Sequence, residues 1–208
     1  MSINATNNGT ARELIPAGNY IARCYQMIEI GTVDEFVMGK PVRAKKVRIG
    51  WELPTELKVF KEEKGEQPLV ISKEYTLSMN EKANLRKDLK SWRGKDFTEK
   101  EAQCFDITTL IGVACMLNII HKPNKDNTRS YEQIAGITPM PKGIKAPAQI
   151  NKNFVLSYDS FNQEMFDSLP EFIRTKMQGS LEYNAMKDPH AKTIDANHIE
   201  EPVDDLPF

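Results

Sequence analysis

The feature that most constrains the fold is a strict alternation of side-chain character over residues 46–53. Charged residues or glycine separate apolar residues at every second position, and the apolar set is Val47, Ile49, Trp51 and Leu53. Successive side chains of a β-strand point to opposite faces, so this two-residue period predicts a strand with one face buried. We expect that strand to run from Val42 and to end at Pro54, because proline cannot donate to the ladder.

Four more segments have the apolar and β-branched character of strands, and a helix is predicted between the third and the fourth. The five predicted strands are residues 19–30, 42–53, 69–78, 112–120 and 130–138. In the helix, Leu85, Leu89 and Trp92 recur on one stripe, Asn80 is a candidate N-cap and Gly94 a candidate stop. Residues 31–41 and 55–68 are predicted loops.

Five strands with one helix after the third match the oligonucleotide-binding (OB) fold, a five-stranded, partly open Greek-key barrel. We therefore expect a mainly β protein with a C-terminal helical extension. Its predicted short helices include one in which Phe172, Ile173 and Met177 dock on the core. The predicted parts are a flexible arm (1–13), an OB domain (14–141), an extension whose short helices pack on the barrel (142–183) and a disordered acidic tail (184–208).

Charge is distributed unevenly along the 208 residues, although the net charge is only −1. From Ala185 to the end there are six acidic and two basic residues, which gives −4 and leaves +3 for the rest. Residues 38–51 contain five cations and no acid. A basic body with an acidic tail is typical of proteins that handle nucleic acid, and ordinary solvated charge is the alternative reading.

Cations and aromatic residues alternate in the segments that an OB fold uses for binding, namely one sheet face and the loops between strands 1–2 and 4–5. Cations follow a phosphate backbone and flat rings stack on unpaired bases, so this combination selects single strands. Filling of the barrel by the rings is the alternative. The candidate contacts are Arg23, Tyr25, Phe36, Lys40, Arg43, Lys45, Lys46, Arg48, Lys73, Tyr75, Lys122, Lys125, Arg129 and Tyr131.

Signatures of catalysis and of cofactor or metal binding are missing from the sequence. There is no phosphate-binding glycine loop, no nucleophile elbow and no histidine or cysteine spacing for zinc. The three cysteines form no CxxC pair. We expect them to be free thiols that serve as packing residues, as in a protein of the reducing cytoplasm. The first ten residues do not resemble a secretory signal, and the longest apolar run, 110–117, is too short to cross a bilayer. We expect a soluble protein without enzymatic activity, cofactor or metal.

Several short motifs resemble those of phage-encoded single-stranded DNA-binding proteins, and the similarity covers roughly residues 14–183. The motifs are Pro16-Ala17-Gly18-Asn19-Tyr20, Gly39-Lys40-Pro41, Trp51-Glu52-Leu53-Pro54, residues 73–94, Ala135-Gly136-Ile137, Pro141-Lys142-Gly143 and Leu169-Pro170-Glu171-Phe172-Ile173. The last five residues also resemble the acidic tip with which bacterial single-stranded DNA-binding proteins recruit replication and repair enzymes. This tip is Asp204, Asp205, Leu206, Pro207 and Phe208, with leucine where isoleucine is usual.

The resemblance implies an OB fold that coats single-stranded DNA during phage replication and recombination, in the cytoplasm of a bacterial host. Phage or host replication proteins would bind the tip. A protein-interaction adaptor and a strand-annealing recombination accessory are the alternatives. The sequence leaves monomer and homodimer both open.

Overall fold

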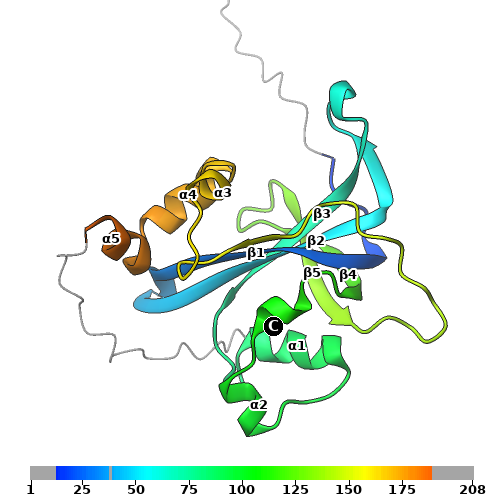
Figure 1. The fold of residues 1–208 in the computed structure, drawn as a ribbon. Helices are drawn as coiled ribbons and strands as arrows, with labels where there is room; N and C mark the ends of the chain where they lie inside the picture. The colour runs from blue at the N-terminus through cyan, green and yellow to red at the C-terminus, as the bar shows by residue number, and fades with distance from the viewer. Residues whose placement is uncertain (1–12, 38, 189–208) are drawn as a thin grey trace, which may run out of the picture.

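A computed structural model describes residues 13–37 and 39–188 of the chain. Most of the described residues belong to one large sheet and to short helices on either side of it (Figure 1). In chain order the elements are β1 (Gly18–Val37), β2 (Lys40–Val59), the 3₁₀ helix η1 (Glu62–Lys64), β3 (Glu66–Thr76), α1 (Asn84–Arg93), α2 (Glu99–Gln103), the 3₁₀ helix η2 (Ile107–Leu110), β4 (Ala114–Pro123), β5 (Ser130–Thr138), β6 (Phe154–Leu156), α3 (Gln163–Asp167), α4 (Glu171–Gln178) and α5 (Leu181–Lys187).

The sheet has six strands, and its main path is β3-β2-β1-β4-β5. All neighbours on this path are antiparallel, while the short β6 pairs with β1 in parallel. In the described part of the chain no ladder joins β3 to β5, so the sheet is not closed into a barrel. The mainly β class and the added helices agree with the sequence prediction.

Two predicted loops are in fact largely strand. Residues 31–41 were expected to connect the first two strands, but β1 and β2 form one long hairpin in which Val37 pairs with Lys40. Pro54 does not end β2, because the pairing with β3 shifts register between Leu53 and Leu57. A bulge at this place tolerates a residue without an N–H, and the strand continues to Val59.

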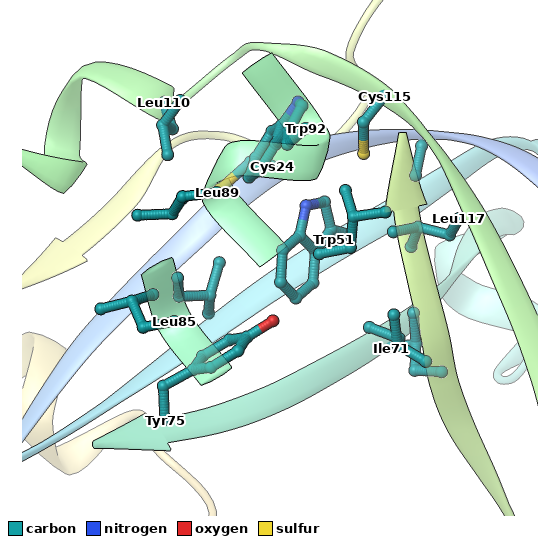
Figure 2. Close-up of a cluster of buried hydrophobic side chains, with 14 of the residues drawn as sticks. Cys24, Trp51, Ile71, Tyr75, Leu85, Leu89, Trp92, Leu110, Cys115 and Leu117 are labelled. Carbon is teal, nitrogen blue, oxygen red and sulfur yellow. The ribbon is translucent and has the colours of Figure 1, made fainter. Parts of the chain in front are cut away.

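The main core lies between the sheet and α1, as Figure 2 shows. Leu85, Leu89 and Trp92 of α1 are all buried, and the rings of Trp92 and Trp51 lie 5.8 Å apart. The helix ends where predicted, because Gly94 takes the left-handed conformation with φ 68°. Its N-cap is Ala83 rather than Asn80. The core also buries two of the cysteines, and burial raises the pKa of the Cys24 thiol to about 12.

A second core holds α3, α4 and α5 against the end of the β1–β2 hairpin, on the opposite side from α1 and α2 (Figure 1). Ile173 and Met177 of α4 are buried there as expected, whereas Phe172 is 62% exposed. At Gly31, φ is +91° and an added Cβ would lie 2.7 Å from Ser180, so only glycine allows α5 to approach β1 this closely. Since α5 reaches Lys187, the first residues of the predicted disordered tail are helical. No described helix has the length and apolar character needed to span a membrane.

Candidate nucleic-acid interface

A groove of about 920 Å³ lies along the β2–β3 side of the sheet. Its walls come from β2, β3, the N-terminal residues 13–16 and the start of α4. Apolar side chains that line it remain exposed, including Leu57 of β2 and Val70 of β3. Exposed apolar groups gathered in one hollow mark a binding surface more often than isolated ones do.

One cation and one ring define the α4 end of this groove. The Arg48 guanidinium carbon lies 5.4 Å from the centre of the Phe172 ring. Burial lowers the pKa of Arg48, and the nearby Glu74 acts in the opposite direction. The guanidinium stays charged, since an arginine pKa begins above 12.

The position of α4 is fixed by contacts of residues that follow Phe172 in the helix. Ile173 and Met177 are buried in the second core, and Lys176 Nζ donates to carboxylate oxygens of Glu35 and Glu74. Phe172 falls off this buried stripe and faces the groove instead. The helix therefore presents the ring without using it for packing.

The other end of the groove lies at the β2–β3 connection and the N-terminal segment. Phe60, which follows β2, lines the groove and is 59% exposed. Lys58 Nζ lies 2.5 Å from Glu13 Oε2, so this cation is already paired. Ile15 is clamped by β4 and β5: its N–H donates to Glu132 Oε1 at 3.1 Å, and His121 Nε2 lies 2.7 Å from its carbonyl oxygen.

The basic loop predicted over residues 121–129 begins at His121 of this clamp, but β4 extends to Pro123, so only residues 124–129 connect the two strands. Lys122, Lys125 and Arg129 are exposed, and none of them has an ion-pair partner in the described part of the chain. Tyr131 beside them is also exposed. These four predicted contacts are therefore exposed on the β4–β5 hairpin, and none of them lines the groove itself.

The predicted cations of the β1–β2 hairpin are placed differently, because acids on β1 face them. Arg43 Nε lies 2.7 Å from Asp34, Lys45 Nζ 2.7 Å from Glu29 and Lys46 Nζ 2.6 Å from Glu35. Phe36, at 79% exposed, and Lys40 lie at the hairpin end. That end is remote from the β4–β5 loop, because β4 pairs with the opposite end of β1, from Gly18 to Arg23.

The remaining four candidates are engaged in the fold. Tyr75 is only 3% exposed and its hydroxyl donates to Asp88 at 2.8 Å, so the expectation that it stacks on a base is corrected to a core role (Figure 2). Lys73 pairs with the same Asp88 at 2.6 Å. The Arg23 guanidinium donates to the carbonyl oxygens of Gly112 and Pro147 at 2.7 and 2.6 Å. Tyr25 is half-buried at a bulge of β1, and burial raises its pKa.

Sequence reasoning missed both rings of the groove. The sequence places Phe172 on the docking face of its helix, but only Ile173 and Met177 have the four-residue spacing of one stripe. Phe60 stands among charged residues in a segment predicted to be an exposed loop. An aromatic residue in such a segment was the available signal.

Comparisons of the chain with family models, curated proteins and solved structures give no significant match. The predicted partner-binding tip, Asp204 to Phe208, lies outside the described residues.

Proposed function

We propose that this protein binds single-stranded DNA without strong sequence preference, in the groove along β2 and β3. The observation that carries the proposal is the Arg48–Phe172 pair, a charged group and an exposed ring within 5.4 Å in a groove that also holds Phe60. The proposed setting is phage DNA replication and recombination in the cytoplasm of a bacterial host. No catalytic step is part of it.

Single strands suit this groove better than a duplex. Stacking on a ring requires an open base face, and a duplex hides both faces of every base. Arg48 contacts a phosphate or a base plane beside Phe172, while Lys122, Lys125 and Arg129 extend the contact along the backbone. Each neutralised phosphate of a single strand contributes about −0.7 to the log–log salt slope, so four cations predict about −2.8.

We include in this proposal that the strands are arranged as in an OB fold, which the order of the strands supports. β1 pairs with both β2 and β4, and α1 lies between β3 and β4 in the chain. OB proteins bind oligonucleotides on the face of strands 2 and 3. The proposed groove is on that pair of strands.

Replacement of the two exposed phenylalanines tests the proposal. We expect Phe172→Ala to weaken binding of a fluorescent oligonucleotide by about 1–3 kcal/mol with an unchanged salt slope, because stacking releases no counterions. Phe36→Ala, at the remote hairpin end, is the matched control and should have a smaller effect. Equal affinity for duplex and single strand, or a larger loss with Phe36→Ala, would overturn the proposed site.

Recruitment of replication proteins through the tip is the second part of the proposal. Adjacent acids, an apolar Leu206-Pro207-Phe208 end and the terminal carboxylate suit a partner pocket with a basic rim. Removing residues 204–208 should abolish capture of a phage or host replication protein while single-strand affinity stays the same or rises modestly at low salt. Identical partners for both forms in a pull-down from infected cells would leave the tip as a solubility device.

A further inference from the structure

A second cavity, of about 490 Å³, opens where β6, the start of α1 and the turn after α2 meet the sheet. Its accessible apolar wall includes Leu77, Met79, Phe105 and Val155, which come from three separate segments. The volume is within the ~300–1,000 Å³ of typical ligand pockets. None of its lining residues lines the β2–β3 groove. It is therefore a separate place on the molecule.

The charged groups that line this cavity are mostly acidic. Glu29, Asp106 and Asp159 contribute carboxylates, and Lys45 is the one cation among the lining residues. Lys45 Nζ lies 2.7 Å from Glu29 Oε1, so this pair is internally neutralised. Hydrogen bonds from the Thr108 hydroxyl and N–H lower the pKa of Asp106, which stays ionised at neutral pH. Asp106 and Asp159 therefore carry the net negative charge.

This negative charge excludes two candidate ligands, namely nucleic acid and the C-terminal residues of the chain itself. Phosphates are repelled by the two carboxylates, so the cavity does not extend a nucleic-acid path. The acidic C-terminal residues of the chain itself, with −4 from Ala185 onward, are repelled for the same reason. Charge complementarity leaves a basic ligand, and Met79 in the wall can adapt to apolar side chains of different shape.

We propose that this cavity is the docking site for a basic amphipathic peptide segment of a partner protein. Apolar side chains of the segment pack on Leu77, Met79, Phe105 and Val155, and flanking lysines or arginines meet Asp106 and Asp159. Binding of an amphipathic segment by an apolar hollow is a common recognition mode, and the acidic residues supply its selectivity. The protein then contacts a single strand and a basic partner on different surfaces.

Synthetic peptides provide the probe. A labelled leucine/lysine peptide with helical spacing is titrated against the full-length protein by fluorescence anisotropy, and a leucine/glutamate peptide of the same pattern is the control. Val155 lines the cavity and is exposed on β6, so Val155→Lys adds a cation at the site. Val113→Lys is the matched variant, because Val113 is an equally accessible valine that lines neither cavity.

We expect the basic peptide to bind at least about tenfold more tightly than the acidic one, and Val155→Lys to weaken it by a similar factor. Val113→Lys should bind like the parent protein. The double variant Asp106→Asn, Asp159→Asn keeps the shape of the cavity and should lower both the affinity and its salt dependence. Equal binding of the two peptides, no loss with Val155→Lys, or displacement of the peptide by a saturating oligonucleotide would each overturn the proposal.

Discussion

Two groups of three cations look alike in the sequence but differ in their surroundings. Arg43, Lys45 and Lys46 of the β1–β2 hairpin each contact a carboxylate of β1, whereas Lys122, Lys125 and Arg129 at the turn of the β4–β5 hairpin have no such partner among the described residues. A phosphate that approaches the hairpin meets a locally neutral surface. A phosphate that approaches the loop meets uncompensated positive charge and releases counterions.

The contrast teaches that the number of cations in a segment is a poor measure of its affinity for phosphate. An exposed ion pair such as Arg43–Asp34 adds little to stability, because water solvates and screens both charges. The consequence of the pairing is that these three pairs offer no net charge to a ligand. The Arg43 hydrogen bond also lowers the pKa of Asp34, which keeps that acid ionised beside its partner.

Aromatic residues show the same contrast between engaged and available groups, and this predicts the largest effect. Tyr75 lies in the main core, while Phe172 lies in the groove. Tyr75→Ala should lower the free energy of unfolding by about 3–5 kcal/mol, because it leaves a cavity and removes one of the two hydrogen-bond donors to Asp88. Urea unfolding measures this loss, and Phe172→Ala should stay within about 0.5 kcal/mol of the parent. A mild effect of Tyr75→Ala would show that the ring is not a core element.

Arg23 gives the next largest expected effect and tests whether an engaged cation contributes to binding. Its guanidinium holds residues 146–147 across β1, and its cross-strand neighbour Glu52, 0% exposed, accepts the N–H groups of Ile150 and Asn151 at 2.7 Å. Arg23→Ala should therefore lower the free energy of unfolding by about 1.5–3 kcal/mol. The salt slope of single-strand binding should not change. A shallower slope in the variant would return Arg23 to the interface.

Much of the fold could be predicted from local pattern. The alternation over residues 46–53, the stripe of Leu85, Leu89 and Trp92, and the Gly94 stop each report a local requirement that the structure obeys. Pro54 shows the limit of such rules. It lies at a bulge in the pairing with β3, where its missing N–H breaks no ladder hydrogen bond, so the strand continues. The closure of the sheet also lies beyond local pattern, since it depends on how β3 and β5 approach in space.

The candidate site was less predictable, because its character depends on cross-strand neighbours. Residues 38–51 contain no acid, yet Glu29, Asp34 and Glu35 are brought against them by the register of the hairpin. In the same way, Tyr75 and Lys73 share a strand face that turned out to be covered by Asp88 of α1. Only the pairing of strands reveals which charges and rings remain available.

Triple replacement of the two cation groups tests the comparison directly. Lys122→Ala, Lys125→Ala and Arg129→Ala together should make the log–log salt slope shallower by about 2, at about 0.7 for each lost phosphate contact. Arg43→Ala, Lys45→Ala and Lys46→Ala together should leave the slope nearly unchanged. Titration of a fluorescent oligonucleotide at several salt concentrations measures both. Equal slopes for the two triple variants would remove the distinction between the hairpin and the loop.

The smallest effect is expected from Glu101→Gln, which tests whether the salt slope of binding depends on where charges lie or on the protein's net charge. The backbone N–H of Thr98, the Arg93 guanidinium and the Thr98 hydroxyl lower the pKa of Glu101 to about 2. The folded-state pKa is below the unfolded value of 4.5, so the stabilisation is complete above pH 4.5 and is lost as the pH falls towards 2. Glu101→Gln should lower the melting temperature slightly at pH 7, and the difference from the parent should shrink over that window.

The variant also removes a negative charge next to Arg93, which is packed 4.1 Å from the centre of the Phe97 ring. If placement governs binding, its salt slope will match the parent's; a steeper slope would mean that net charge alone is sufficient.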